Sequence, residues 1–453
     1  MEQIMKMVLR FLYFGFLSVL LFTSSCGEKS TEKGFKWDSS DAGGVHLAMK
    51  AITDVMVSDI FAPPIASRVY AYSAIAAYES VVHAVDDYRS LAGQLNELQS
   101  GPQPEPDLPY DYEVAATKAI LKVGHALTFD ERLFHELKTP VVEYLMKKEI
   151  PESIFIRSTE YGEKVAAHIL EWSRGDYYAQ TRTYPKYTPE RLPERWIQTP
   201  PAYMDAIEPA WNRIRPMVMD STNQFVPKAP TEFSPQNNSQ FFREALAVYT
   251  ALDEGDEMEK REIAGFWDCN PFAVRSLGHL MVGEKKISPG GHWMNIASLA
   301  SREAEADLMK SVEALAMTSI ALFDGFISCW DEKYRSNLLR PETYINRYID
   351  SDWVPALQSP PFPEHTSGHS VISTAASIAL TKVFGDDFEF DDTTQLEFEL
   401  PVRSFNSFKE AAAEAAVSRF YGGIHYMPAI EDGVEQGKKV GNLVVQQIST
   451  RNN

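Results

Sequence analysis

The sequence predicts an all-α fold in which two packed helical bundles are joined by a long, ordered crossover. Apolar residues recur at helical spacing through most of the chain, and strand-like alternation is scarce. A stretch rich in Pro and Tyr, residues 176–235, separates the helical regions 41–175 and 236–453. The length of 453 residues is consistent with this division, since a single hydrophobic core rarely grows beyond about 250–300 residues.

The first helical bundle is predicted from four amphipathic segments. The first segment is Ala-rich and carries Pro64 in its first turn, where a helix tolerates proline. Start signals at Thr128 and Pro151 precede the third and fourth segments. The predicted helices are 64–85, 113–125, 130–148 and 152–172.

The crossover differs from both bundles in composition. Proline is frequent enough in residues 176–235 to interrupt helices repeatedly. The many aromatic side chains argue against disorder, because disordered segments are poor in aromatic residues. We therefore expect an irregular but ordered segment that packs on both bundles.

The second bundle is predicted to contain a central helix. Residues 303–331 are apolar on much of the helical circumference, which is typical of a buried helix. A break is expected at residues 289–291, and an acidic loop is expected at residues 386–394. The other predicted helices are 238–252, 258–267, 370–383, 409–421 and 433–448.

Composition and charge narrow the class of protein. Hydrophobic residues make up 44% of the chain and charged residues 23%, as in soluble globular proteins. The formal net charge of −20 argues against a nucleic-acid partner, because a surface that follows phosphates is basic. It does not exclude small anionic substrates, since a pocket can be locally positive on an acidic protein.

The N-terminus predicts export. Two basic residues precede an apolar run, 11–22, that is too short to span a bilayer, so residues 1–25 are predicted to be a signal peptide. Small residues directly precede Cys26, which resembles a bacterial lipoprotein signal; a plain secretory signal with an incidental Cys is the alternative. We expect an outer-membrane or periplasmic lipoprotein that contacts the membrane only through lipid on Cys26, with residues 26–40 as a flexible tether.

The other two cysteines, Cys269 and Cys329, both lie in apolar surroundings. Two residues of this kind supply neither a disulfide framework nor the spacing of a metal site. We predict two buried free thiols and no zinc site built on thiolates.

A Ser-Gly-His segment lies where a helix is predicted to begin. The first turn of a helix presents unpaired N–H groups and the positive end of the helix dipole, so an anion can bind there. Ser367 adds a hydroxyl donor, Gly368 allows close approach of the backbone, and His369 can transfer a proton near neutral pH. The alternative is an ordinary serine N-cap followed by a surface histidine.

Cations flank this segment on both sides. Lys333 and Arg340 are seven residues apart, which places them on roughly one face if the helix continues, although Pro341 indicates a stop or a restart. The alternative is a solvated basic face. Arg419 follows an Ala-rich helical stretch and precedes His425; here the alternative is an ion pair with Glu414 or Glu410.

Taken in order, these segments resemble a known signature. K-x6-R-P, Ser-Gly-His and S-R-x5-H together are similar to the three-part signature of vanadium-dependent haloperoxidases and the type-2 phosphatidic acid phosphatase superfamily. Residues 68–79, 291–293 and 324–333 further resemble the haloperoxidase-like branch found in bacterial lipoproteins. The resemblance extends over most of the mature chain.

The resemblance implies a role for each residue of the signature. His425 would be the axial vanadium ligand or a phosphorus-attacking nucleophile, His369 the acid/base, and Lys333 the group that polarises the oxidant. The oxyanion, vanadate or phosphate, would be held in the second bundle by Lys333, Arg340, Ser367, Gly368, Arg419 and His425.

Three functions remain open at this stage. A haloperoxidase would oxidise halide with hydrogen peroxide at bound vanadate. A metal-free acid phosphatase would cleave a phosphoester through a phosphohistidine at His425. A non-catalytic glycan-binding lipoprotein would account for the lipid signal and the tyrosines, but not for cations and histidines at this spacing.

The chain departs from the family pattern at two positions. Thr366 replaces a proline, and Ala429 replaces an aspartate that holds the axial histidine. Because such a partner is worth about 10–100-fold in affinity or activity, we expect a substitute. The candidates are Asp324, Glu431 and Asp432.

Two further histidines are candidate pocket residues. His365 either controls halide access or is a polar loop residue. His292 either lines the pocket mouth or packs beside Trp293.

Overall fold

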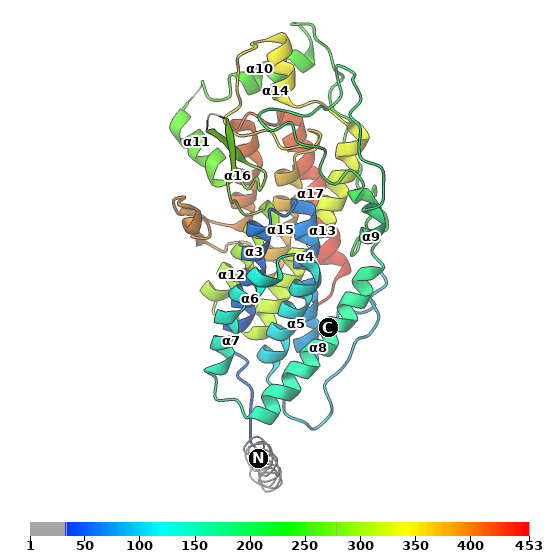
Figure 1. The fold of residues 1–453 in the computed structure, drawn as a ribbon, viewed down its shortest axis with the longest axis vertical. Helices are drawn as coiled ribbons and strands as arrows, with labels where there is room; N and C mark the ends of the chain where they lie inside the picture. Colours follow the sequence, from blue (N-terminus) through cyan, green and yellow to red (C-terminus); the bar gives the residue numbers. More distant parts are fainter. Residues whose placement is uncertain (1–31, 33, 254, 278, 453) are drawn as a thin grey trace, which may run out of the picture.

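The computed structural model describes residue 32 and residues 34–253, 255–277 and 279–452. The predicted signal peptide and Cys26 lie outside these residues. The molecule is elongated, and its long helices run roughly along the long axis (Figure 1). The fold is all-α, with two small antiparallel strand pairs that the sequence pattern did not predict.

Between residues 34 and 175, the N-terminal half contains six α-helices. Asp111 and Asp130 cap two of them by accepting hydrogen bonds from the N–H groups of Val114 and Leu133. The predicted helix 130–148 is divided in two, because Pro140 has no N–H and begins a new helix. The helices are α3 (Gly43–Ser58), α4 (Pro63–Val81, followed by η2, Val82–Ala84), α5 (Tyr112–Leu127), α6 (Glu131–Leu137), α7 (Thr139–Met146) and α8 (Glu152–Arg174).

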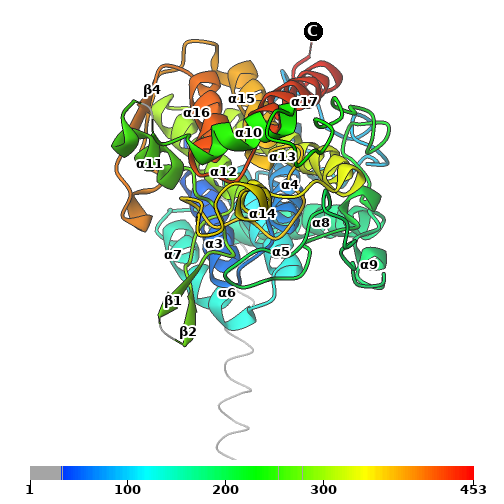
Figure 2. The same ribbon diagram turned by 90° about the horizontal axis from the view of Figure 1, so that it is seen from above.

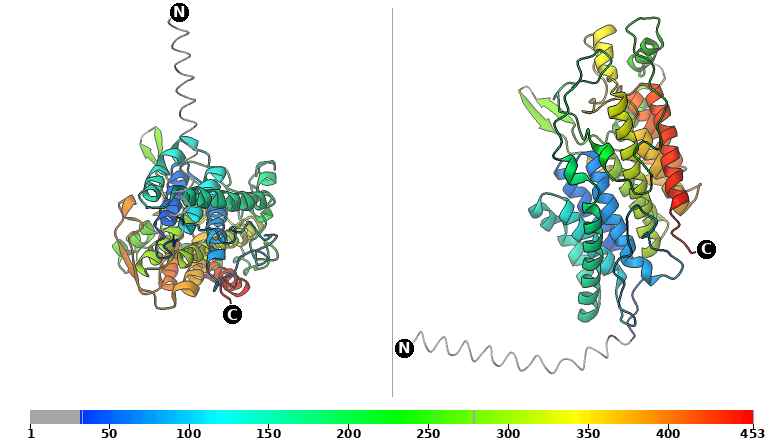
Figure 3. Two further views of the ribbon diagram at one scale, coloured as in Figure 1. Left: turned by 90° about the horizontal axis from the view of Figure 1, so that it is seen from below. Right: turned by 90° about the vertical axis from the view of Figure 1, so that its right-hand side faces the viewer.

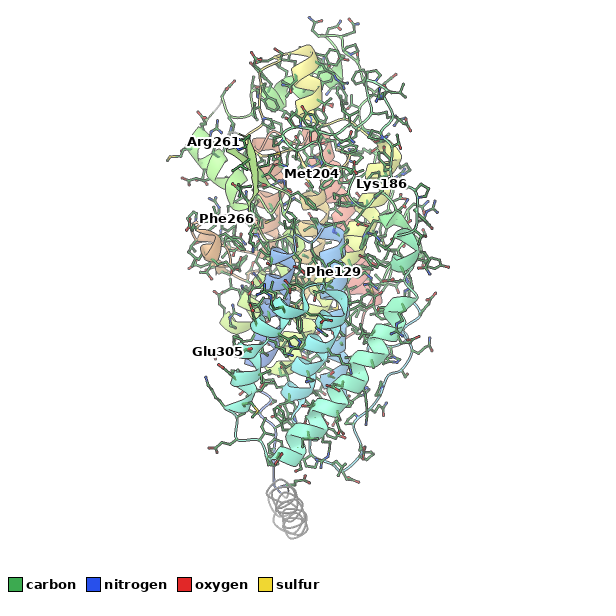
Figure 4. All side chains as sticks on the ribbon, viewed as in Figure 1. Phe129, Lys186, Met204, Arg261, Phe266 and Glu305 are labelled. Atoms are coloured by element: carbon green, nitrogen blue, oxygen red, sulfur yellow. The ribbon has the colours of Figure 1, made fainter. Side chains whose placement is uncertain are left out.

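The segment 176–235 is irregular and packed. All of its residues are described, and its regular structure consists of α9 (Tyr178–Thr181) and η3 (Trp211–Arg213). Trp196 and Trp211 are fully buried, which anchors the segment to the rest of the fold. Lys186 and Met204 mark its course over the surface of the upper half (Figure 4).

The C-terminal half holds the remaining helices and both strand pairs. Val274 pairs with Gly283 in one strand pair, and Phe390 pairs with Phe405 in the other. The elements are α10 (Gln240–Tyr249), α11 (Glu257–Phe266), β1 (Val274–Leu277), β2 (Leu280–Gly283), α12 (Pro289–Glu303), α13 (Leu308–Ser336), α14 (Pro341–Tyr348), α15 (Gly368–Phe384), β3 (Phe390–Asp392), η4 (Leu396–Phe398), β4 (Arg403–Phe405), α16 (Phe408–Tyr421) and α17 (Met427–Gln447).

Two local expectations were wrong. The predicted break at 289–291 is the first turn of α12, which starts with Pro289 and is capped by the Ser288 side chain. The central helix runs from Leu308 to Ser336 rather than over 303–331, because Asp307 caps its start and Asn337 ends it in the left-handed conformation.

Helix α13 lies at the centre of the molecule. It packs against α4 from the N-terminal half and against α12, α15 and α17 from the C-terminal half. From above, α15, α16 and α17 lie on one side of α13, and α5, α7 and α8 lie on the other (Figure 2). The right panel of Figure 3 shows the same pairing of blue-to-cyan and yellow-to-red helices, so one continuous core joins the two bundles.

By length and composition, α13 is apolar enough to cross a membrane. Its most apolar stretch is completely buried inside the protein, however, as in the core helix of a globular fold. The end of the predicted tether also contacts this fold, because the ring of Trp37 packs on Tyr112 and the carbonyl of Ser39 accepts a hydrogen bond from Leu308 N.

Candidate active site

The candidate site lies at the start of α15. The loop before α15, the connection between α13 and α14, and the turn after α16 meet there. Helix α13 ends just after Lys333, and Arg340 is the N-cap residue of the next helix, α14. The helix does not continue from Lys333 to Arg340, and a new helix starts at Pro341, as that proline indicated, so the two cations do not share one helical face. The left-handed residue Asn337 turns the chain between them, and tertiary folding brings both cations to the same place.

Lys333 is completely buried and fully hydrogen-bonded. Its Nζ donates to the carbonyl oxygens of Pro363, Glu364 and Thr366 at 3.0, 3.0 and 2.6 Å. Burial lowers the pKa of Lys333 to about 8. In this structure Lys333 therefore holds the loop that leads into Ser367 and places a positive charge behind the site.

Arg340 and Arg419 are also buried, and each keeps a nitrogen without a partner. Arg340 donates to the carbonyl oxygens of Phe362 and Ile424, both at 2.9 Å. Arg419 donates to the carbonyl oxygen of Trp267 at 2.8 Å. Among the described residues, Arg340 Nη2 and Arg419 Nε have no hydrogen-bond partner. Burial lowers the pKa of both guanidinium groups, that of Arg340 to about 10.

The surroundings of His425 determine its tautomer. Its Nε2 lies 3.1 Å from Nη1 of Arg340, and a guanidinium can only donate, so Nε2 must carry the lone pair. Its Nδ1 donates to Glu364 Oε1 at 2.8 Å, and the same oxygen accepts from Tyr426 N at 3.0 Å. Burial lowers the pKa of His425 well below its usual value, with further lowering by Arg340, Lys333 and Arg419, so the ring is neutral.

Glu364 is the residue that sequence reasoning missed. The three candidates for the partner of His425 were wrong. Asp324 accepts hydrogen bonds from the backbone N–H groups of 217–219, Glu431 is exposed, and Asp432 is partly exposed near Lys228. Glu364 lies 61 residues before His425 and follows no spacing rule, so no sequence signal pointed to it.

The Ser-Gly-His segment begins α15, as expected. The Ser367 hydroxyl caps the helix by accepting from Ser370 N at 3.3 Å, and Ser367 N donates to the carbonyl of Ala429 at 2.9 Å. The His369 ring contacts the Trp267 backbone, and its Nε2 has no partner among the described residues. Burial, reinforced by Arg419, lowers the pKa of His369 well below its usual value, so this ring is neutral as well.

A narrow cavity of about 30 Å³ opens among these groups. It is lined by Gly368, His369, Arg419 and His425. Arg340 lies behind His425, to which it donates a hydrogen bond, and does not itself line the cavity. The apolar walls are Phe326, Trp330 and Phe362. A much larger cavity of about 880 Å³ lies between α3, α12 and the segment after β3, but none of the described candidate residues lines it.

The residues around the narrow cavity suit an oxyanion. Three buried nitrogens have no partner in the part of the chain that the structure describes: Arg340 Nη2, Arg419 Nε and His369 Nε2. Leaving such atoms unpaired is costly. The oxygens of a tetrahedral anion would accept from the two guanidinium groups. His425 Nε2 would offer its lone pair to the central atom once that lone pair no longer accepts from Arg340 Nη1. The chemistry of this donor set therefore fits vanadate and fits phosphate equally well.

The remaining two histidines contact protein groups. His365 Nε2 donates to the Lys228 carbonyl at 3.0 Å, and burial lowers the pKa of His365 to about 4. His292 is fully buried, stacks on Trp267 at 4.6 Å, and does not line the cavity. Its placement at the pocket mouth was therefore wrong, because the first turn of α12 points it into the core.

Comparison with known proteins identifies the class to which this fold and site belong. A family described as the VCPO second helical-bundle domain matches residues 313–453. A crystal structure described as the first bacterial vanadium-dependent iodoperoxidase is 48% identical, with a TM-score of 0.85, and the match covers 92% of this chain and 100% of that one. No curated protein sequence matches the chain significantly.

More distant structures share the fold. Holo and apo forms of a bacterial vanadium-dependent chloroperoxidase align with TM-scores of 0.65 and 0.64 at 15% and 16% identity. These matches cover 85% and 84% of this chain, and 92% and 93% of the other chains.

The chain belongs to the vanadium haloperoxidase superfamily. It is an enzyme of that superfamily, which leaves the glycan-binding alternative without support.

Proposed function

We propose that this enzyme is a vanadium-dependent haloperoxidase that oxidises halide with hydrogen peroxide. The observation that carries the proposal is a set of buried nitrogens on Arg340, Arg419 and His369 that have no partner among the described residues, close to His425. Such a set is complementary to a multiply charged oxyanion with one open coordination position. The 48% identity to a vanadium-dependent iodoperoxidase supports vanadate as that anion.

Each residue has a task in this proposal. Arg340 and Arg419 would hold the oxyanion, and Lys333 adds positive charge without using a free hydrogen. Glu364 keeps His425 in the tautomer whose Nε2 can bind a metal centre. Neutral His369 can accept a proton from peroxide as it enters. Vanadate, when bound, supplies the Lewis acid that activates peroxide for attack by halide.

The apolar wall of the cavity has a separate effect. The rings of Trp330 and Phe362 pack in a tilted arrangement with centroids 4.9 Å apart, and Lys333 lies 5.1 Å from the Phe362 ring. Apolar walls exclude water, which strengthens electrostatic interactions inside the site.

Iodide is the halide that we propose for this enzyme. The support is the similarity to the iodoperoxidase over 92% of the chain. Iodide is also more readily oxidised than bromide or chloride, so the weakest oxidant suffices for it.

A side-by-side assay tests the proposal. The purified chain is loaded with orthovanadate, and halogenation of a dione is measured with iodide, bromide and chloride, next to hydrolysis of an aryl phosphate. We expect peroxide-dependent halogenation, fastest with iodide and lost in His369→Ala. If halogenation is absent at every pH although vanadate is bound, the proposal is wrong.

The same assay identifies a phosphatase. Hydrolysis of the aryl phosphate in the absence of vanadate, inhibited by added vanadate and lost in His425→Ala, would indicate chemistry through a phosphohistidine. The oxyanion site is compatible with both reactions, so the rates of the two reactions decide between them.

We also propose that the enzyme is exported and lipid-anchored through Cys26. The support is the apolar run at 11–22 followed by small residues and Cys26. Mass spectrometry of the mature N-terminus tests this proposal. A chain that is cleaved elsewhere and carries no lipid would contradict it.

A further inference from the structure

Three side chains that the proposed chemistry does not use form a hydrogen-bonded series beside the cavity. Cys269 follows α11, His292 lies in the first turn of α12, and Asp392 ends β3. The Sγ of Cys269 is 3.5 Å from His292 Nδ1, and His292 Nε2 is 2.8 Å from Asp392 Oδ2. A thiol, an imidazole and a carboxylate in this order are the arrangement that activates a cysteine nucleophile.

Asp392 is held as an ionised, oriented carboxylate. It is completely buried, and its Oδ1 accepts from the backbone N and the hydroxyl of Thr394 at 3.0 and 2.7 Å. Burial acts to raise the pKa of Asp392, but His292 and Thr394 outweigh burial and lower it. The carboxylate therefore accepts from His292 Nε2–H and directs Nδ1 toward the sulfur.

His292 is fixed in position and can carry the proton of Cys269. The Trp267 ring stacks on it with ring centroids 4.6 Å apart, which limits rotation of the imidazole. Burial lowers the pKa of His292, but Asp392 and Cys269 outweigh burial and raise it to about 10. The geometry therefore lets Nδ1 of His292 take the proton of Cys269 when the sulfur reacts.

Cys269 also lies on the cavity that holds the candidate site. It lines this cavity together with Gly368, His369, Arg419 and His425, although only 2% of the residue is exposed. The cavity gives small molecules such as water or hydrogen peroxide a route to the sulfur.

Cys329 provides a comparison within the same chain. It is buried as well, but its sulfur contacts the carbonyl and hydroxyl of Thr366, and no histidine–carboxylate pair within the described residues is hydrogen-bonded to it. Burial raises the pKa of the Cys329 thiol. Cys329 should therefore remain a thiol under conditions in which Cys269 reacts.

We propose that Cys269 is a peroxide-reactive cysteine, activated by His292 and Asp392, on the wall of the oxyanion cavity. Nδ1 of His292 takes the thiol proton as the sulfur attacks one oxygen of hydrogen peroxide, so that an S–O bond forms and the O–O bond breaks. The departing hydroxide takes the proton of the His292 imidazolium and leaves as water. Sulfur is oxidised by two electrons to a sulfenic acid, and peroxide is reduced. The reaction needs neither vanadate nor halide, so it can fail or succeed independently of the proposed halogenation.

The first test compares the two thiols of one chain. The full chain, with and without orthovanadate and without halide, is exposed to hydrogen peroxide, quenched at intervals and analysed by peptide mass spectrometry. We expect oxygen addition at Cys269 to be at least about tenfold faster than at Cys329, and reversal by dithiothreitol at early times. Equal rates at the two residues would overturn the proposal.

Matched variants test the activation. Asp392→Asn keeps the shape of the side chain and removes the charge, and His292→Gln removes the proton acceptor. Both should slow oxidation of Cys269 by roughly tenfold or more and leave Cys329 unchanged. Cys329→Ser is the control that should keep the rate at Cys269. If Cys269 reacts just as fast in both variants, the series has no activating role.

One measurement remains decisive if these two variants do not fold. A small methylthiolating reagent is applied to the native chain, and the rates of labelling at Cys269 and Cys329 are compared. We expect preferential labelling of Cys269 in the folded chain and equal labelling after denaturation. Preferential labelling of Cys329, or of neither residue, would contradict activation of Cys269.

Discussion

Glu364 determines what His425 can do. One of its carboxylate oxygens accepts from both His425 Nδ1 and Tyr426 N, so the imidazole proton is kept away from Nε2. Without that acceptor, the ring could rotate or change tautomer, and the lone pair facing the cavity would be lost. The carboxylate performs the task that the family pattern assigns to an aspartate where this chain has Ala429.

Replacement of Glu364 by glutamine should weaken vanadate binding. The amide can still accept a hydrogen bond, but it lacks the charge that favours a donating Nδ1–H. Loss of such a supporting group typically costs about 10–100-fold in affinity or activity. Titration of the variant with vanadate, in parallel with its halogenation rate, measures the effect.

Glu79→Gln is the matched control for that change. Glu79 is also a buried glutamate that accepts two hydrogen bonds, but it lies on α4 and contacts Ser90 and Leu91. Its replacement should leave vanadate affinity unchanged. Equal losses in both variants would indicate a general effect on the fold instead of a role for Glu364 at the site.

The pKa of Glu364 also makes stability depend on pH. Burial raises this pKa from 4.5 to about 7, so the folded chain retains a proton that the unfolded chain releases between these values. The contribution of Glu364 to the free energy of unfolding therefore falls as pH rises through this window, by about 3 kcal/mol at about 1.4 kcal/mol per unit.

Urea denaturation at pH 5 and pH 8, without vanadate, checks this prediction. Glu364→Gln carries no titrating group at this position. The free energy of unfolding of the variant, relative to that of the wild type, should therefore be higher at pH 8 than at pH 5. A constant difference between the two proteins would show that Glu364 ionises in the folded chain as it does in the unfolded chain.

At the scale of whole helices, close packing of α15 against α17 keeps the candidate site in place. Three glycines spaced by four residues, Gly433, Gly437 and Gly441, face α15. A Cβ on Gly437 would come within 2.3 Å of the Val371 carbonyl oxygen, and one on Gly433 within 3.1 Å of the Ser367 carbonyl oxygen. The absence of side chains lets the two helices approach, and this contact positions the first turn of α15.

Gly437→Ala should therefore destabilise the fold. The added methyl group must push α15 and α17 apart, and overpacking of this kind costs about 1–3 kcal/mol. Gly265→Ala is the control, because a Cβ there meets no atom within 4 Å and alanine is the better helix former. Urea denaturation measures the free energy of unfolding of both variants. If Gly265→Ala lowers it as much as Gly437→Ala does, the close approach of α15 and α17 does not explain the effect.

For the molecule as a whole, the site concentrates positive charge inside an acidic protein. Lys333, Arg340 and Arg419 are all buried within a chain of formal net charge −20. Each loses hydration, and burial lowers the pKa of all three groups. An oxyanion would compensate this charge, so binding should stabilise the native state.

Vanadate should raise the melting temperature of the protein. At a concentration of one hundred times Kd, binding contributes about 2.7 kcal/mol, which corresponds to roughly 3 °C for a chain of this size. Differential scanning fluorimetry measures the shift, with chloride at equal ionic strength as the reference. Phosphate should act in the same direction, because its charge and shape are similar.

Two arginine variants show whether the shift comes from the site. Arg340→Gln should abolish it, whereas Arg157→Gln should preserve it, because Arg157 lies on α8 and contacts Glu32 and the Pro109 carbonyl. A shift that persists in Arg340→Gln would place anion binding elsewhere on the molecule.

The sequence by itself determined the all-α fold, most of the helices and the residue types of the oxyanion site. Helical periodicity and capping are local, because each backbone hydrogen bond joins residues four apart, so a single sequence carries that information. The order Lys333, Arg340, Ser-Gly-His, Arg419 and His425 is likewise visible along the chain.

Only the tertiary structure decided which groups meet. His425 is paired with Glu364, 61 residues away, and Cys269 is linked through His292 to Asp392, a further 100 residues along the chain. These partners lie in loops and at element ends, where no period relates sequence separation to distance. Packing of α13 against both bundles, and of α15 against α17, brings them together, and that packing depends on the shape of the whole core.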